Sequence, residues 1–227
     1  MSRNAMNGPN IARIDQSKLR ENVYSALCDA FTRGKFAPGD TVSLRHLADQ
    51  LGTSITPVRE AVRRLVAEGA LIDTPSRTLM VPPFDANRMQ DLKKARLALE
   101  ALVLDQAMEH MDDETLARMD AILAAPKAMN VTTPDLQQNY DFHFTLYRKS
   151  GSVVLLPLVQ ALWLQYGAYL NLVIHHQDAA EIEEHKFHHQ ILDALRTHDR
   201  SSAQEALAAD IERSFRVILP GEQTHGS

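Results

Sequence analysis

Residues 42–65 of the chain read VSLRHLADQLGTSITPVREAVRRL, and this stretch decides the fold of the N-terminal part. Apolar residues recur at helical spacing after Ser43, and Gly52 ends that pattern. A second helical pattern opens at Thr56-Pro57, where proline is tolerated because its missing N–H would have no partner in a first turn. The buried stripe of this second segment consists of Val58, Ala61, Val62 and Leu65. The stretch therefore predicts two short helices joined by a tight turn at 52–54.

The flanking sequence completes the unit. A helix is expected after Ser17 and ends at Gly34, and two short strands, 71–73 and 79–81, surround a turn. Together these elements predict a winged helix-turn-helix, whose second helix places its N-terminal residues against base edges in the major groove of DNA. Arg59 lies in the first turn of that helix, off the buried stripe, and the guanidinium fork of arginine can pair with guanine. The alternative is an exposed arginine on a solvated helix face.

Charge is distributed unevenly along the chain. The net charge is −5 overall, but residues 1–82 hold 11 Lys+Arg against 8 Asp+Glu, a net charge of +3. Residues 83–227 hold 13 against 21, a net charge of −8. A basic N-terminal part on an acidic remainder suggests that only the former meets an anionic partner.

The general composition predicts a folded cytoplasmic protein. The chain has 227 residues and is 44% hydrophobic, which is enough to bury a core. The chain contains no run of eighteen apolar residues, so no membrane span is predicted. The polar N-terminus does not resemble a signal peptide. Cys28 is the only cysteine, so an internal disulfide is impossible.

The chain is expected to divide at Pro82-Pro83, which cannot continue a strand or a helix. We expect a flexible N-terminus over 1–15, a winged helix-turn-helix over 16–82 and a helical domain over 83–220. Beyond residue 83 the pattern is helical throughout, with about six helices. The predicted fold class is therefore mainly α, a winged helix-turn-helix followed by an all-helical bundle.

The N-terminal pattern resembles that of the GntR family of bacterial regulators. The resemblance rests on residues 42–48, 51–61, Arg64-Leu65 and Glu68-Gly69. It implies that the chain binds double-stranded DNA and that the tip of the wing enters the minor groove. The residues that would contact DNA by this resemblance are Arg45, Ser54, Thr56, Arg59 and Arg77. The chain departs from the family in having Ile55 in place of an arginine, and Pro75-Ser76-Arg77 in place of wing glycines.

The remainder resembles the ligand-binding FCD domain of the FadR subgroup, in its shorter VanR-like form. The resemblance rests on residues 96–100, 139–143, 150–151, His188, 191–195, Asp199 and 210–211. Many members of this subgroup hold a divalent metal. The ligands carried over by position are Asn139, His143, His188 and Asp210, with His185 as a potential substitute. Zinc is the expected metal, with nickel or manganese as alternatives.

The sequence pattern agrees in part with this ligand set. Asn139 and His143 share a helix face, and His188 and Asp210 sit among apolar residues of two further helices. An acid on an apolar stripe is costly unless it is paired or binds a metal. The alternatives are a buried hydrogen-bonded cluster without metal, or a cluster that contacts the effector directly.

Arg96 is a second candidate for ligand binding. The resemblance places it at the effector cavity, where it could pair with a carboxylate through two hydrogen bonds. The alternative is an ion pair with Glu100 on the helix surface. Four aromatic residues would line the same cavity or form plain core: Tyr140, Trp163, Tyr166 and Tyr169.

Taken together, the sequence predicts a ligand-responsive transcription regulator and no enzyme. We expect a homodimeric repressor that binds an inverted-repeat operator and is released by a small organic acid, with no membrane partner. Two alternatives remain at this point: a metal-free regulator that responds to an acyl-CoA, and a helical metalloenzyme using the same polar cluster.

Overall fold

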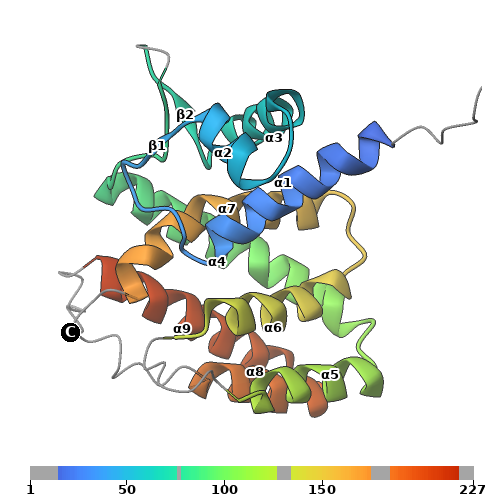
Figure 1. The fold of residues 1–227 in the computed structure, drawn as a ribbon. Helices are drawn as coiled ribbons and strands as arrows, with labels where there is room; N and C mark the ends of the chain where they lie inside the picture. Colours follow the sequence, from blue (N-terminus) through green and yellow to red (C-terminus); the bar gives the residue numbers. More distant parts are fainter. Residues whose placement is uncertain (1–14, 76–77, 127–133, 175–184, 220–227) are drawn as a thin grey trace, which may run out of the picture.

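The computed structural model describes residues 15–75, 78–126, 134–174 and 185–219. Within these ranges a head of three helices and three short strands precedes a body of six helices (Figure 1). The predicted fold class, a mainly helical chain with an N-terminal winged helix-turn-helix, is confirmed. No helix among the described residues is both long and apolar enough to span a membrane.

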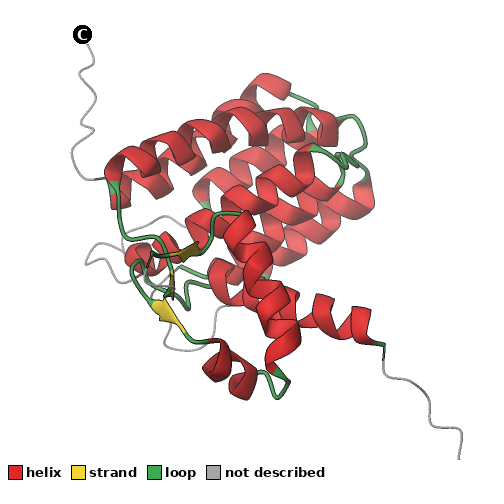
Figure 2. Cartoon of the chain, turned by 90° about the horizontal axis from the view of Figure 1, so that it is seen from above, coloured by secondary structure: helices red, strands yellow, loops and turns green. Residues whose placement is uncertain are grey.

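The elements of the head are α1 (Gln16–Thr32), β1 (Thr41–Val42), α2 (Leu44–Gln50), α3 (Ile55–Ala67), β2 (Ile72–Asp73) and β3 (Leu79–Met80). The helices of the body are α4 (Ala86–Met108), α5 (Asp113–Ala124), α6 (Leu136–Arg148), α7 (Leu155–Ile174), α8 (Lys186–Arg196) and α9 (Arg200–Ile218). Helices dominate the view from above, and the small sheet lies at one side of the molecule (Figure 2).

Most helices begin where a short acidic side chain caps the first turn. Asp85 Oδ1 accepts the backbone N–H of Arg88 at 2.8 Å, so the predicted cap of α4 is confirmed. Aspartates cap four other helices in the same way: Asp15, Asp112, Asp135 and Asp199. The cap at Asp15 makes α1 begin at Gln16, slightly before the start that the sequence predicts.

The wing contains one strand more than the sequence predicts. The expected hairpin forms as β2 and β3, which pair antiparallel with Ile72 opposite Met80. On the other edge of β3 lies β1, with Thr41 opposite Met80, so the strand order is β1-β3-β2. Unlike β2 and β3, β1 has no partner strand across a short turn in the sequence, and two residues alone show no alternating hydrophobicity, so the local pattern does not reveal it.

Helix α7 belongs to two cores at once. In the body core its Trp163 and Leu170 are buried, whereas Leu164 and Ala168, on its opposite side, are buried in the core of the head. In Figure 1, α7 passes behind α1, which it contacts, while α5 and α8 lie at the end of the body away from the head. The head therefore closes its hydrophobic core only by using a helix of the body.

Hydrogen bonds fasten the same junction. The Arg88 guanidinium of α4 donates to the carbonyl of Gly69 at 2.9 Å and to Gln165 Oε1 at 2.9 Å. Asn171 on α7 donates to the carbonyl of Gly34 at 2.8 Å. Gly34 has a φ of +62°, the left-handed conformation that glycine adopts at no steric cost after a helix. These bonds connect the ends of α1 and α3 to the body.

Candidate functional site

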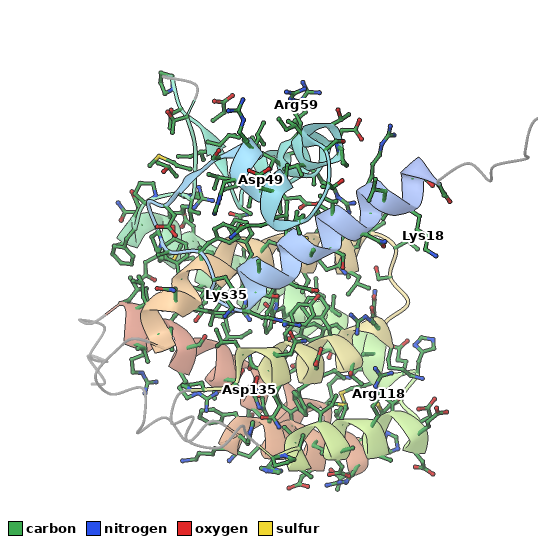
Figure 3. The ribbon with its side chains drawn as sticks, viewed as in Figure 1. Lys18, Lys35, Asp49, Arg59, Arg118 and Asp135 are labelled. Carbon is green, nitrogen blue, oxygen red and sulfur yellow. The ribbon has the colours of Figure 1, made fainter. Side chains whose placement is uncertain are left out.

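The outward edge of α3 carries an accessible arginine. Arg59 is exposed and projects from the head on the side away from the body (Figure 3). Two neighbouring charges of α3 face α1 instead: Glu60 Oε2 lies 2.8 Å from Arg20 Nε, and Arg64 Nη1 lies 3.6 Å from Glu21 Oε2. These pairs join the two helices and leave the edge with Arg59 accessible to an outside partner.

The other predicted DNA contacts lie at the N-terminal ends of α2 and α3. Arg45, in the first turn of α2, is exposed, and so are Ser54 and Thr56 at the start of α3. Ser54 occupies the N-cap position of α3, yet its side chain makes no capping hydrogen bond. The predicted contact Arg77 lies outside the described residues. The DNA-contacting roles of all five residues stay predictions.

The body contains a buried cluster of metal-ligating side chains. His143 on α6, His188 on α8 and Asp210 on α9 each offer a ligand atom, and these atoms lie within 4.8 Å of one another. The two histidines are fully buried, and Asp210 is 5% exposed. Three helices thus bring together three of the four residues that the sequence singled out as ligands.

The fourth predicted ligand, Asn139, lies one turn before His143 on α6 and is half-buried. Its side chain lines a small pocket between α6, α7 and α9, together with Arg213. His185, the potential substitute, lies at the Nδ1 of His188 rather than at its Nε2, which is near Asp210. The Nδ1 atoms of the two histidines are 3.3 Å apart. Whether Asn139 completes a ligand set stays a prediction.

A chain of hydrogen bonds determines the protonation of His143. Tyr147 Oη lies 2.6 Å from Glu100 Oε2, and since a carboxylate only accepts, the tyrosine donates there. Its oxygen then accepts from His143 Nδ1 at 3.2 Å. With the ring proton on Nδ1, the lone pair of Nε2 in a neutral His143 faces Asp210 Oδ2 at 3.1 Å. Two acceptors this close require a cation, either a proton or a metal ion.

The surroundings disfavour the proton. Burial lowers the pKa of His143, and this effect outweighs the attraction of Asp210. Burial by itself would raise the pKa of Asp210, but its two histidine neighbours, His188 first and His143 second, outweigh burial and hold that pKa well below its usual range. The donor set is thus neutral imidazole plus ionised carboxylate, which suits a divalent metal of the zinc type.

Unpaired buried atoms point to the same region. Nε2 of His188 has no hydrogen-bond partner among the described residues, and it lies 3.7 Å from Asp210 Oδ1. Trp163 Nε1 and Tyr166 Oη are likewise buried without such a partner. The Trp163 ring lies 5.3 Å from the His143 ring. Since buried polar atoms are rarely left unpaired, the cluster fits a bound metal ion or ligand.

Arg96 is buried beside this cluster. Its Nε lies 2.5 Å and its Nη2 3.3 Å from the carboxylate of Glu100, and it is 2% exposed. The guanidinium lies over the rings of Trp163 and Tyr166, at 4.5 and 4.7 Å. Burial would lower the pKa of Arg96, but Glu100 outweighs that effect and raises it. The alternative of a surface ion pair was wrong in one respect: the pair forms, but it is buried.

Sequence reasoning missed three members of this network. Glu100 was considered only as a surface partner, and Tyr147 and Arg213 were not singled out. A signal for Glu100 is present in the sequence, because it continues a stripe of α4 whose other members are apolar apart from Arg96. Nothing local marks Tyr147, whose contact with Glu100 joins residues 47 apart in the chain.

Comparison with known proteins identifies both parts of the chain. The model of bacterial regulatory proteins of the gntR family matches residues 19–80, and the FCD domain model matches residues 91–213. The HTH-type transcriptional regulator McbR of Escherichia coli is 27% identical over 92% of this chain and 97% of its own length. The HTH-type transcriptional repressor GlaR of the same organism is 23% identical over 86% and 93%.

Solved structures agree with this. A structure of E. coli McbR/YncC superposes with a TM-score of 0.79 at 27% identity, covering 91% of this chain and 98% of that one. A GntR regulator from Rhodococcus shares the fold alone, with a TM-score of 0.63 at 20% identity, covering 88% and 98%. The helix-turn-helix head and the helical body therefore have their counterparts in known regulators. The chain belongs to the GntR family of bacterial regulatory proteins with an FCD domain, and it is a DNA-binding transcription regulator rather than an enzyme.

Proposed function

We propose that the protein is a repressor that binds an inverted-repeat operator as a homodimer and releases it when a small organic acid binds in a metal-containing body. The observation that carries the proposal is the buried His143–His188–Asp210 cluster, in which His188 Nε2 lacks a partner among the described residues. Repression is supported by the similarity to GlaR, which is named a repressor.

The dimer follows from the size of the head. One recognition helix contacts only a few base pairs, so two heads related by two-fold symmetry read an inverted repeat and multiply the specificity. In this arrangement Ser54, Thr56 and Arg59 contact backbone and bases. Arg45 contacts the phosphate backbone, and Arg77 enters the minor groove.

Arg59→Ala is expected to weaken operator binding by about 1–3 kcal/mol and to relax the preference at one base position per half-site. The operator is first selected from random-sequence duplexes with the full-length wild type, and both proteins are then titrated against it. Arg118→Ala is the control, since Arg118 is also exposed but lies on α5, far from α3 (Figure 3). Wild-type affinity and base preference in Arg59→Ala would show that α3 does not read the operator through this residue.

The metal proposal rests on the fit of the donor set. His143, His188 and Asp210 would hold the ion, with Asn139 as the fourth ligand, and zinc is the expected metal. A bound divalent cation would add positive charge to the buried region and join α6, α8 and α9. The hydrogen bond between His143 Nδ1 and Tyr147 orients the ring, as partners of metal-bound histidines commonly do.

Removal of the metal is expected to lower the thermal unfolding temperature, because an ion that binds only the folded state adds to the free energy of unfolding. Protein purified without an affinity tag or chelator should contain close to one divalent ion per chain by elemental analysis. His143→Ala and His188→Ala should each lose most of it, and Asp210→Ala should bind it more weakly.

His189→Ala is the matched control for the metal experiment. His189 follows His188 on the same helix but is exposed, so its loss should leave the metal content unchanged. Wild-type protein that stays metal-free after incubation with zinc would contradict the metal proposal. A metal-free protein that instead binds an acyl-CoA would favour that alternative, although the pocket that Asn139 and Arg213 line measures only about 50 Å³ among the described residues.

An acid that releases DNA must bind one arrangement of the two heads more tightly than the other. A ligand with equal affinity for both arrangements does not change their populations. We expect this coupling to run through the junction at 81–84 and through α7, which contributes to the cores of head and body. Arg96 stays a candidate for binding the acid, but a carboxylate can pair with its Nε and Nη2 only by displacing Glu100.

A further inference from the structure

Two side chains of the body hold the C-terminal end of the recognition helix α3. Gln165 on α7 donates from Nε2 to the backbone carbonyl of Glu68 at 3.0 Å. Arg88 on α4 donates from Nη2 to the carbonyl of Gly69 at 2.9 Å. Glu68 is the C-cap of α3, and Gly69 follows it. Because carbonyl groups at the end of a helix lack partners within it, the body supplies partners that α3 itself does not have.

The two side chains are also joined to each other. Arg88 Nη2 donates to Gln165 Oε1 at 2.9 Å. A guanidinium only donates and a backbone carbonyl only accepts, so one orientation of the Gln165 amide serves both neighbours, with Oε1 toward Arg88 and Nε2 toward Glu68. All three bonds are partly buried, where water competes less with them. Arg88 and Gln165 thus form a clamp on the end of α3.

Gly69 allows the clamp to come this close. Its φ of +77° is the left-handed conformation that often follows a helix, and a Cβ at this position would lie 3.0 Å from Cδ of Gln165. The positive guanidinium of Arg88 also suits this end of α3, where the helix carbonyls carry a partial negative charge. Backbone conformation, close approach and charge therefore all fit the same contact.

Other hydrogen bonds between body and head end elsewhere. Asn171 donates to the carbonyl of Gly34, just after α1, and Tyr169 Oη lies 3.2 Å from the carbonyl of Pro83 in the junction. The clamp, by contrast, acts on α3 itself. Arg59 lies nine residues before Glu68, or about 13 Å along the helix. A change of about 15° in the direction of α3, measured from its clamped end, would move Arg59 by about 3.5 Å, close to the rise of about 3.4 Å between base pairs.

We propose that Arg88 and Gln165 fix the direction of α3 relative to the body and thereby determine which spacing between operator half-sites the protein accepts. The inference rests on the proposed inverted-repeat dimer, because spacing matters only when two heads bind one operator. With the clamp formed, both recognition helices are held at one separation and orientation. Without it, each head still reads its half-site through Arg59 but turns more freely, so operators of several spacings bind with similar affinity.

The test measures the preference for operator spacing. The half-site selected by the wild type is placed in inverted repeats at the selected spacing and at spacings one or two base pairs shorter or longer, and each duplex is titrated with full-length protein. The wild type should bind the selected spacing about 10-fold or more tightly than the others. Gln165→Glu keeps an acceptor for Arg88 but removes the donor to Glu68, so the preference should fall below about 3-fold. Gln190→Glu makes the same change at an exposed position of α8 and should keep the wild-type preference.

Arg88→Met covers the case in which Gln165→Glu does not fold, which circular dichroism detects. It removes the donor to Gly69 and should lower the spacing preference in the same way. Folded variants that bind more weakly at every spacing but keep the wild-type preference would overturn the inference, because the clamp would then contribute only stability. A wild type that binds a single half-site as tightly as the inverted repeat would instead contradict the proposed dimer, and the inference with it.

Discussion

Glu100→Gln is expected to lower the free energy of unfolding by about 3–5 kcal/mol, although it changes only one atom of the side chain. Glu100 is fully buried and accepts hydrogen bonds from Arg96 Nε at 2.5 Å and from Tyr147 Oη at 2.6 Å. The amide replaces an acceptor by a donor and leaves the buried charge of Arg96 uncompensated. The loss should appear in urea denaturation as a lower midpoint at an unchanged slope.

The control for this variant is an ion pair of similar chemistry at the surface. Arg196 pairs with Asp120 where both side chains are about half exposed, so Asp120→Asn should cost no more than about 1 kcal/mol. Combining Arg96→Met with Glu100→Gln should restore part of the stability, because the unpaired charge is then gone. If Glu100→Gln unfolds within 1 kcal/mol of the wild type, the buried pair does not carry the stability assigned to it.

For Arg96 and Glu100 the sequence predicts the contact between the two side chains but not their burial. Their spacing predicts an ion pair, and the pair forms, but spacing of four residues describes surface and buried pairs equally well. Burial depends on α6, α7 and α9, which cover this face of α4 and come from distant parts of the chain. The periodicity of Met89, Leu92 and Val103 around the pair was the local indication that both residues point into the core.

The ligand cluster was predictable as a set of residues but not as a geometry. His143, His188 and Asp210 were selected by resemblance and by their places on apolar stripes, and the structure brings their ligand atoms together. The same reasoning included Asn139, which lines the neighbouring pocket, and overlooked Arg213, which pairs with Asp210. Asn139 and Arg213 each lie one helical turn from a cluster residue, His143 and Asp210. Residues one turn apart share a helix face, so periodicity does not show which of them reaches the cluster.

In the head, the recognition helix was predictable because its stripe of Val58, Ala61, Val62 and Leu65 is contained in one segment. The completion of the head core by α7 was not predictable. Leu164 and Ala168 of α7 fill its core from about a hundred residues away, and no local pattern distinguishes them from the residues of α7 that face the body. A helix that is apolar all round, as α7 is, is expected to be buried on both sides, but its sequence does not show which elements cover it.

Gly167→Ala is expected to destabilise the whole protein by about 3 kcal/mol, although alanine normally favours a helix over glycine. A Cβ at this position would lie 2.5 Å from the carbonyl oxygen of Phe31 and 2.8 Å from its carbon, both backbone atoms of α1. Neither helix can relieve the contact by turning a side chain, so α1 and α7 must separate, and overpacking of this kind costs about 1–3 kcal/mol or more. The separation would also open the head core around Leu164 and Ala168.

The measurement follows unfolding in urea with two probes. Trp163, the only tryptophan, reports on the body through its fluorescence, while far-ultraviolet circular dichroism reports on the helices of head and body together. Because α7 completes the head core, both probes should give one coincident transition, in the wild type and at a lower urea concentration in Gly167→Ala. Leu172→Ala, an exposed position on the same helix, should unfold close to the wild type. Separate transitions in the wild type, or a Gly167→Ala protein as stable as the wild type, would mean that α7 does not hold the head to the body, and the coupling of acid binding to DNA release would have to run through the junction at 81–84 alone.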